Sequence, residues 1–416
     1  MDASLIILII ALVVSLYSAI NIGANDVANS MATSVASNAL TIKQAVFVAA
    51  IFDVLGAVVA GSYVANTIRK GLIDPLEFSD NQNLFVFGML AAVLGSAFWV
   101  NIATYFKLPV STSHSIIGGV LGFGLVSIGI AGINWHVVLV VALSWIISPV
   151  FGGIISYVIF MIIKKNILNS RTPIEKTRKI GPFFSGLVFF VLPMAIIFKG
   201  PKRLHLDLTF FEALFFSLLI GAGGYFGARF LLRRYKEKKE YPYEQVEKMA
   251  NPLQIVTACF KAFSHGANDV ANAIGPVAAI VAVLQTHKLE MELEIPFWLL
   301  LIGGGGLAFG AYTWGYRVVE TMGKKITAIT PTRGFAAEFG TATTVLLCSR
   351  LGMPVSTTHV AVGNIIGVGL ARGMSAINLN VIKNIFLAWV ISLPAAAVFS
   401  IGIFFLLKLI FGAAVL

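Results

Sequence analysis

Five stretches of this chain run for about 20 residues with almost no charged side chain, the length at which an α-helix crosses the apolar core of a bilayer. They are residues 5–20, 45–65, 137–163, 208–232 and 381–407. None alternates as a strand would, and backbone in lipid needs internal hydrogen bonds, so helices are the expected spanning elements. Because 58% of the residues are hydrophobic and only 12% are charged, a soluble core could not bury this chain. The sequence therefore predicts an all-α polytopic membrane protein.

Three sequence landmarks occur twice at a nearly constant spacing. Gly-Ala-Asn-Asp-Val-Ala-Asn at 23–29 returns 243 residues later at 266–272, and Pro-Val-Ser-Thr-Ser-His at 109–114 returns 245 residues later as Pro-Val-Ser-Thr-Thr-His at 354–359. Trp145 and Trp389 lie 244 residues apart in similar surroundings. We interpret this as an internal duplication. It predicts a first repeat at 1–163, a linker at 164–249 and a second repeat at 250–416.

The linker carries most of the evidence on topology. Two apolar runs lie between basic loops at 164–179 and 233–248, and the positive-inside rule places both loops in the cytoplasm. The net charge of +11 is thereby explained without a nucleic-acid partner. By parity, the N- and C-termini are expected outside the cytoplasm and the two repeats are expected to be inverted. The span count stays open, because residues 84–106 and 115–130 either cross separately or form a re-entrant hairpin.

The first motif places a carboxylate inside an apolar run of each repeat. Asp26 and Asp269 are expensive to bury in a membrane, which makes each a candidate functional residue. Asn29 and Asn272 follow three positions later and share a helix face with them. The glycine that opens each motif predicts an interrupted helix whose second part is capped by Asn or Asp. The alternative is that each Asp only fixes packing at a kink.

The second motif predicts a helix N-terminus rich in hydroxyl groups. Proline ends the preceding helix, and the Ser/Thr cluster caps the next one. Free N–H groups and hydroxyls at such an end favour an anion. The hydroxyls belong to Ser111, Thr112, Ser113, Ser356, Thr357 and Thr358.

Neither motif contains Lys or Arg, so the charges of an anion and two carboxylates must be balanced by bound cations. This predicts symport. Sodium suits hard oxygen ligands, and protonation of the two Asp is the open alternative. We assign sodium to Asp26, Asn29, Ser111, Asp269, Asn272 and Ser356. We assign the oxyanion to Asn25, Thr112, Ser113, Asn268, Thr357 and Thr358.

Two further acids lie in apolar stretches and have no acidic counterpart in the other repeat. Asp53 and Glu338 are candidate gating or secondary ion positions, or buried ion pairs such as Glu338 with Arg333. The Ser-His spacing of the second motif does not indicate an enzyme, because no nucleophile elbow surrounds it and two equivalent copies would be unusual for a hydrolase. No cofactor is expected besides the coupling ions.

The paired motifs resemble those of the PiT family of inorganic phosphate transporters, over both halves of the chain. The short linker resembles that of microbial members. The resemblance implies inorganic phosphate as the substrate, with sodium coupling in many members and proton coupling in others, while a related branch handles sulfate. It also implies an inverted-repeat fold of about 12 membrane segments with broken helices and re-entrant hairpins, a homodimer and a multi-pass plasma-membrane location. The family's signature acids match Asp26, Asp269, Asp53 and Glu338.

Overall fold

The computed structural model describes residues 3–197, 208–235, 241–286, 288–289, 294–319 and 326–411. Within these residues the regular structure is helical, apart from one isolated antiparallel bridge between Ile73 and Ile133. Nine of the described helices are long and apolar enough to span a bilayer by length and composition. The prediction of an all-α polytopic membrane protein is confirmed. The other described helices of the bundle are shorter or less apolar and are not among these nine.

The described elements follow one another along the chain, and the predicted boundary at 249/250 falls inside one long helix, α9 (Pro242–Thr286). The first repeat contains α1 (Ala3–Ala36), α2 (Ile42–Ala60), α3 (Ser62–Lys70), the 3-10 turn η1 (Pro75–Phe78), α4 (Gln82–Tyr105), α5 (Thr112–Ser127) and α6 (Trp135–Ile163). A π turn, η2 (Lys164–Leu168), leads to the linker helices α7 (Pro173–Ile197) and α8 (Phe210–Arg233). The second repeat contains α9 (Pro242–Thr286), α10 (Phe297–Trp314), α12 (Pro331–Arg350), α13 (Thr357–Arg372), the 3-10 turn η4 (Met374–Ala376) and α14 (Leu379–Phe411).

Local sequence explains where several helices begin. Helix α2 begins with a capping box, in which the Thr41 side chain accepts from the Gln44 backbone N–H and the Gln44 side chain accepts from Thr41. Helix α8 begins with the same device between Thr209 and Glu212. Each box satisfies N–H groups that have no partner within the helix.

Each repeat packs against the other in a reciprocal way. Helix α5 lies on α14, and its counterpart α13 lies on α6. In the same way α1 lies on α10 and α9 lies on α2. Glycines bring these backbones close together: a Cβ on Gly118 would lie 2.3 Å from the Leu393 carbonyl oxygen, and one on Gly363 would lie 2.4 Å from the Pro149 oxygen. The glycines of α5 and α13 therefore serve close helix packing.

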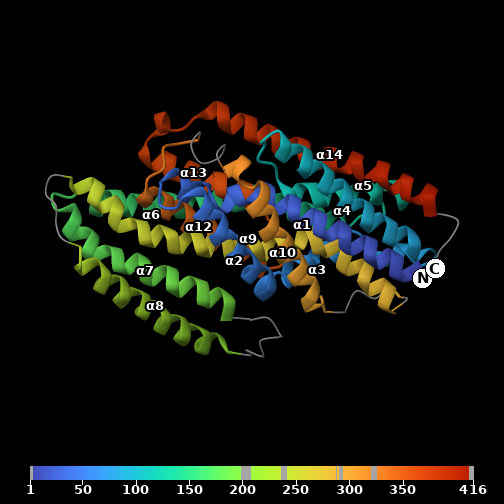
Figure 1. Ribbon diagram of the computed structural model, residues 1–416, viewed down its shortest axis with the longest axis horizontal. Coiled ribbons are helices and arrows are strands. Elements are labelled where there is room, and N and C mark those ends of the chain that lie inside the picture. Colours follow the sequence, from blue (N-terminus) through green and yellow to red (C-terminus); the bar gives the residue numbers. More distant parts are fainter. Residues whose placement is uncertain are drawn as a thin grey trace.

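Two helical hairpins, α4–α5 and α12–α13, enter the bundle from opposite ends (Figure 1). Helices α5 and α13 have 16 residues each, about 24 Å, which is shorter than the roughly 30 Å apolar core of a bilayer. Their N-termini therefore meet inside the bundle instead of at its surface. The equivalent hairpins point in opposite directions, so the repeats are inverted and the hairpins are re-entrant.

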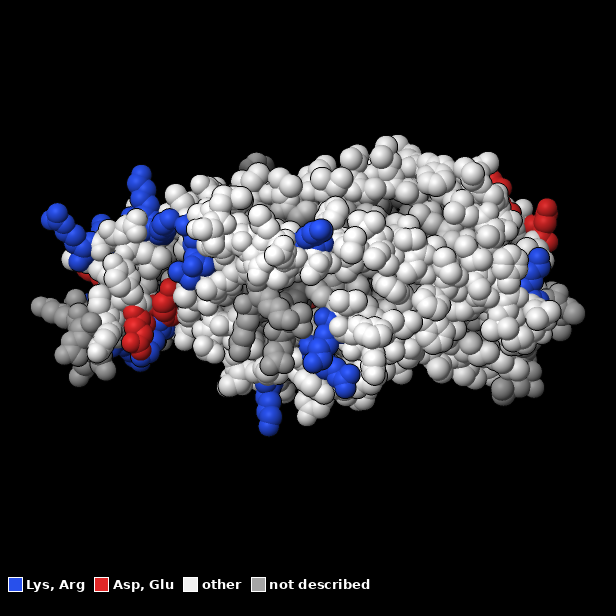
Figure 2. All heavy atoms as spheres, turned by 90° about the horizontal axis from the view of Figure 1, so that it is seen from above, with Lys and Arg blue, Asp and Glu red and all other residues white. Residues whose placement is uncertain are grey.

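Lys and Arg side chains gather at one end of the elongated molecule, the left end in Figure 2. In Figure 1 this is the end where α6 leads to α7 and α8 leads to α9, whereas α1 begins and α14 ends at the opposite end. The chain termini themselves, residues 1–2 and 412–416, and residues 236–240 of the second basic loop lie outside the described residues. The described parts of both basic loops therefore lie at the same end of the molecule, and their assignment to the cytoplasm stays a prediction.

Candidate functional site

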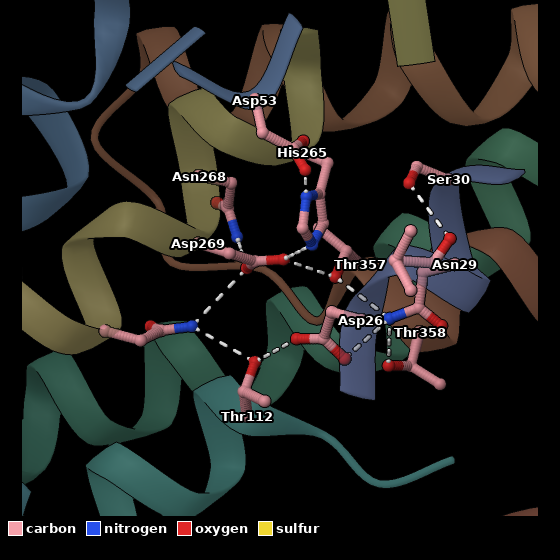
Figure 3. A network of polar contacts seen from close by, with 12 residues as sticks. Asp26, Asn29, Ser30, Asp53, Thr112, His265, Asn268, Asp269, Thr357 and Thr358 are labelled. Carbon is pink, nitrogen blue, oxygen red and sulfur yellow. Dashed lines mark hydrogen bonds and ion pairs between the residues drawn. The ribbon is translucent and has the colours of Figure 1, made fainter. Parts of the chain in front are cut away.

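The two copies of each motif meet at the centre of the bundle. The first motif lies on α1 and α9, and the second lies at the N-termini of α5 and α13 (Figure 3). The two aspartates are completely buried: Asp26 and Asp269 are both 0% exposed. Residues separated by more than 240 positions in the sequence thus form one polar cluster.

The first aspartate is bound by side chains of both repeats. Its Oδ2 accepts the Thr112 hydroxyl at 2.6 Å, and its Oδ1 accepts the Asn29 amide at 2.8 Å. The same Asn29 amide donates across the repeat boundary to the Thr358 hydroxyl at 2.7 Å and lies 3.5 Å from that of Thr357. Asp26 is therefore hydrogen-bonded to the α4–α5 hairpin of its own repeat, whereas Asn29 is hydrogen-bonded to the α12–α13 hairpin of the other repeat (Figure 3).

The second aspartate repeats this arrangement with the halves exchanged. Oδ2 of Asp269 accepts the Thr357 hydroxyl at 2.7 Å, and Oδ1 accepts the Asn272 amide at 3.4 Å. The Asn272 amide also donates to Thr112 and Ser113, at 3.3 Å each. The two motifs thus form a site with approximate two-fold symmetry, in which each Asn joins the aspartate of its own helix to the hydroxyls of the other repeat.

The remaining hydroxyls of the second motif shape the hairpin tips. Ser111 caps α5 by accepting from the His114 N–H, and Ser356 caps α13 by accepting from the His359 N–H. Their assignment to sodium stays a prediction, since these oxygens are engaged in the caps. The Ser113 hydroxyl donates to the Val355 carbonyl at 3.0 Å.

Its counterpart Thr358 donates to the Val110 carbonyl, also at 3.0 Å. Each tip is therefore hydrogen-bonded to the loop of the opposite hairpin.

Asn25 and Asn268 hold those loops in place. Asn25 donates to the Thr104 hydroxyl and the Leu108 carbonyl, both at 3.0 Å, and accepts from the Val110 N–H at 3.3 Å. Asn268 donates to the Asp269 carboxylate at 2.8 Å and to the Val355 carbonyl at 2.9 Å. In this conformation their amides position the loops, and their assignment to the anion stays a prediction.

The expectation of interrupted helices at the first motif was wrong. Helix α1 runs unbroken from residue 3 to 36, and α9 from 242 to 286, through both copies. The motif glycines serve packing: a Cβ on Gly23 would lie 2.0 Å from the Leu307 carbonyl oxygen, and one on Gly266 would lie 2.0 Å from that of Asp53. Contact between two helix backbones requires the missing side chain, whereas the helix itself tolerates glycine. The breaks occur only before the second motif.

A histidine that sequence reasoning left out of the site lies beside the second aspartate. Nδ1 of His265 is hydrogen-bonded to Asp53 at 2.8 Å, and Nε2 lies 2.9 Å from the Asp269 carboxylate (Figure 3). Its spacing of four residues from Asp269, on one helix face, was the available signal. The first repeat has Ile22 at the matching position, so this part of the site is asymmetric.

One ligand atom each of Asp26, His265 and Asp269 lies within 4.8 Å of the others. Both ring nitrogens of the imidazole already face carboxylates, so the oxygen atoms are the better ligands. Two further buried oxygens, Oδ1 of Asn29 and Oδ1 of Asn272, have no hydrogen-bond donor. Amide oxygens without donors beside buried carboxylates offer the oxygen ligands that a hard cation requires.

Glu338 forms a second buried polar cluster beside α1 and α9. Its carboxylate accepts the hydroxyls of Thr33 at 2.7 Å, Ser34 at 2.5 Å and Thr257 at 2.9 Å. The buried amine of Lys261 donates to the Thr33 hydroxyl at 3.4 Å.

The Gln254 amide completes this cluster by donating to Glu338 at 3.2 Å. None of the hydrogen bonds described for Arg333 involves Glu338; the Arg333 guanidinium donates to the Ala328 carbonyl at 3.1 Å. The alternative of a Glu338–Arg333 pair was therefore wrong, because the side chain points into the bundle.

The histidines of the second motif lie behind the hairpin tips. The ring of His114 lies on Trp145 at 3.7 Å, and that of His359 lies on Trp389 at 3.7 Å, with the two imidazoles 4.6 Å apart. Nδ1 of His114 contacts the Trp389 carbonyl, and Nδ1 of His359 contacts the Trp145 carbonyl, at 3.1 Å each. The duplicated His and Trp thus bind each hairpin to the last spans of both repeats.

Buried carboxylates and hydroxyl-bearing helix ends, meeting between inverted repeats in a membrane-spanning bundle, define a membrane transporter. The model of the phosphate transporter family matches residues 22–400. A protein of Pyrococcus furiosus named "Putative phosphate permease PF1020" is 42% identical over 376 residues, which are 90% of each chain. A "Putative phosphate permease" of Haemophilus influenzae is 41% identical over 379 residues, again 90% of each.

A solved structure described as "The sodium-dependent phosphate transporter" has a TM-score of 0.90 and 43% identity, and the match covers 97% of this chain and 99% of the other. The chain belongs to the phosphate transporter family. It is a multi-pass membrane transporter and not an enzyme, and the resemblance to inorganic phosphate transporters is confirmed.

Proposed function

We propose that this chain is a secondary symporter that carries inorganic phosphate together with sodium by alternating access. The observation that supports this most directly is the buried pair Asp26 and Asp269, with ligand oxygens within 4.8 Å of each other. Two like charges at that distance repel each other by about 3.5 kcal/mol at an effective dielectric constant of about 20. A bound sodium ion removes this repulsion.

The asparagines extend the sodium ligands. Oδ1 of Asn29 and Oδ1 of Asn272 are buried without a donor, beside the aspartates of their own helices. Together with the carboxylates they supply neutral and charged oxygen ligands to a cation. The neighbouring solved structure, whose description names sodium dependence, supports the same choice of ion.

Phosphate fits the hydroxyl-rich N-termini of α5 and α13. Thr112 and Thr357 each have one hydroxyl proton, and each donates it to a carboxylate, Asp26 or Asp269. Sodium on a carboxylate competes for that oxygen and frees the proton for an oxyanion at the helix end. We infer from this that sodium binds first and prepares the phosphate site.

The proposal also covers the orientation of the protein in the membrane, the extent of its repeats and its oligomeric state. We propose that the basic end of the bundle faces the cytoplasm and that the termini face outward, in the plasma membrane. The repeats 1–163 and 250–416 would form the transport core around the linker 164–249. We further propose a homodimer, as the family resemblance implies.

Uptake of labelled phosphate into proteoliposomes tests the proposal. An inward sodium gradient at equal pH is expected to drive accumulation of phosphate above its external concentration, and empty liposomes supply the background. A pH gradient without sodium is expected to give only that background. Accumulation that ignores the sodium gradient would overturn the assignment.

A second candidate, proton-coupled transport of phosphate or sulfate, is favoured by one observation. His265 lies between the carboxylates of Asp53 and Asp269, at 2.8 and 2.9 Å, which is a geometry suited to exchanging a proton. This candidate predicts accumulation driven by pH alone, and the proteoliposome experiment separates the two. Competition by excess sulfate tests the identity of the anion.

A further inference from the structure

A cavity of about 440 Å³ lies at the basic end of the molecule, and no residue of the two duplicated motifs lines it. It separates the α7–α8 hairpin from the ends of α6, α9 and α12. Its walls are mainly apolar. The lining side chains include Ile163, Phe184, Leu232, Val246, Met249 and Phe335. Its size falls within the roughly 300–1,000 Å³ typical of ligand pockets.

Three polar residues that line the cavity have their hydroxyls engaged elsewhere. Thr177 donates to the Pro173 carbonyl at 2.8 Å, and Ser185 donates to the Gly224 carbonyl at 3.1 Å. The Thr332 hydroxyl donates to a carboxylate oxygen at 2.9 Å. A ligand in this cavity would therefore contact hydrocarbon and hydroxyl groups whose protons are already donated to other acceptors. This surface favours an alkyl chain over a polar ligand.

Two glycines of α8 keep the cavity open towards the surrounding bilayer. Gly223 and Gly227 line it and are exposed, and a Cβ on either would meet no atom within 4 Å. Helices α7 and α8 are the linker spans whose apolar windows are only 22% and 17% buried, so lipid is the medium around this opening. An acyl chain can therefore enter from the side.

Basic side chains surround the same region. Arg178 directly follows Thr177, which lines the cavity, and its guanidinium donates to the carbonyl of a second lining residue, Tyr235, at 2.6 Å. The buried Nε of Arg178 has no hydrogen-bond partner. Lys165 lies on the turn between two lining residues, and Arg233 and Arg234 follow the lining Leu232.

Among the described residues that surround the cavity, three acids already have partners. Glu175 pairs with Lys179 at 2.8 Å, and Glu244 pairs with Lys248 at 2.6 Å. Glu247 accepts from Thr332. The basic side chains named above, Lys165, Arg178, Arg233 and Arg234, therefore form a basic collar beside the apolar cavity. Figure 2 shows the Lys and Arg side chains gathered at this end.

We propose that this cavity binds an anionic phospholipid. One acyl chain fills the space between the linker hairpin and α9, and the headgroup phosphate rests on the basic collar, with Arg178 as its central contact. A basic patch beside a membrane surface attracts anionic lipid. An apolar cavity next to that patch adds a binding site for one acyl chain of the lipid. The bound lipid would join the linker hairpin to the transport core.

Two variants of the full-length protein separate the parts of this proposal. Gly227→Leu fills the cavity, and Arg178→Gln removes the headgroup contact. The matched control is Gly402→Leu on α14, where an exposed glycine also has no atom within 4 Å of an added Cβ. Lipid retained through detergent purification is measured by native mass spectrometry, and thermal unfolding is followed on adding phosphatidylglycerol or phosphatidylcholine.

The wild type and the Gly402→Leu control are expected to retain phosphatidylglycerol and to gain thermal stability from it, but not from phosphatidylcholine. Gly227→Leu is expected to lose most of the retained lipid. Arg178→Gln is expected to bind phosphatidylglycerol about five-fold more weakly, the loss for one basic residue at a membrane surface.

Retention by Gly227→Leu equal to that of the control would overturn the proposal, as would equal effects of the two lipids on the wild type. A change from dimer to monomer in Gly227→Leu with lipid retention unchanged would show instead that a second copy fills the cavity. If Gly227→Leu does not fold, Arg178→Gln alone decides the outcome.

Discussion

Replacement of Asp26 by Asn tests the central physical argument, because it removes one charge with almost no change in shape. The carboxylate is 0% exposed, lies close to that of Asp269, and accepts hydrogen bonds from Thr112 and Asn29. The amide oxygen of Asn can still accept one of these bonds. The variant therefore isolates the electrostatic contribution of the carboxylate.

Two effects oppose each other in the absence of sodium. Loss of the charge relieves a repulsion of about 3.5 kcal/mol or more, since the ligand oxygens lie within 4.8 Å of each other. It also weakens two charge-assisted hydrogen bonds, each of which contributes about 1.5–3 kcal/mol. These terms nearly cancel, so the variant is expected to fold and to unfold near the wild-type temperature in sodium-free buffer.

The effect on sodium has no such compensation. One unit charge about 4 Å from the ion attracts it by about 4 kcal/mol at an effective dielectric constant of about 20. Since 1.4 kcal/mol is a factor of ten, Asp26→Asn is expected to weaken sodium binding by roughly several hundred-fold. Sodium-driven phosphate uptake should be lost at ordinary sodium concentrations.

Thermal unfolding across a sodium titration, with potassium replacing sodium at constant ionic strength, measures the affinity. Uptake by proteoliposomes measures transport. The matched control is Glu77→Gln, which removes an exposed carboxylate in η1. A sodium-dependent stabilisation in Asp26→Asn equal to that of the control would refute the argument, and so would normal sodium-driven uptake.

Three further predictions follow from named contacts. Thr112→Val removes the hydroxyl bound to Asp26 and should lower kcat/KM for phosphate by about 10- to 100-fold, the loss of a hydrogen bond to a charged group, measured by initial uptake rates. Gly266→Ala should lower the free energy of unfolding by about 1–3 kcal/mol or prevent folding, because its Cβ would lie 2.0 Å from a carbonyl oxygen of α2; thermal unfolding checks this. Glu338→Gln should lower the free energy of unfolding by about 3 kcal/mol, because it leaves Lys261 without a nearby carboxylate. Adding Lys261→Met should restore most of that free energy, as measured by chemical unfolding.

Each of these variants has a control in the same protein. Thr313→Val on α10 removes a half-buried hydroxyl bonded only within its own helix, and uptake should be unchanged. Gly305→Ala places a Cβ where no atom lies within 4 Å and should be nearly neutral. If Gly305→Ala and Gly266→Ala were equally stable, the close backbone contact would not matter. If Lys261→Met failed to rescue Glu338→Gln, the two buried charges would be uncoupled.

Much of the architecture was predictable from the sequence because it depends on local or periodic properties. Apolar runs of span length require helices in lipid, and Pro followed by a Ser/Thr cluster requires a break and a capped helix start. The spacing between duplicated motifs identified the repeats. The basic loops at 164–179 and 233–248 distinguished one end of the molecule from the other.

The helix through the first motif was predicted wrongly for an equally local reason. Glycine permits a break but does not require one, and its use depends on the neighbouring helix. Gly23 and Gly266 are needed because the backbones of α10 and α2 pass within contact distance. The sequence contains the glycine, whereas only the packed structure reveals what the missing side chain makes room for.

Some contacts of the candidate site could be predicted from the sequence and others could not. Helical spacing is enough to place Asp26 beside Asn29, since residues three apart share a face. The contact of Asn29 with Thr358, and that of His265 with Asp53, join residues more than 200 positions apart. Such contacts follow from how inverted repeats cross, and no local pattern contains that information. Sequence alone determined most chemical groups of the candidate site, and tertiary packing decided which of them meet.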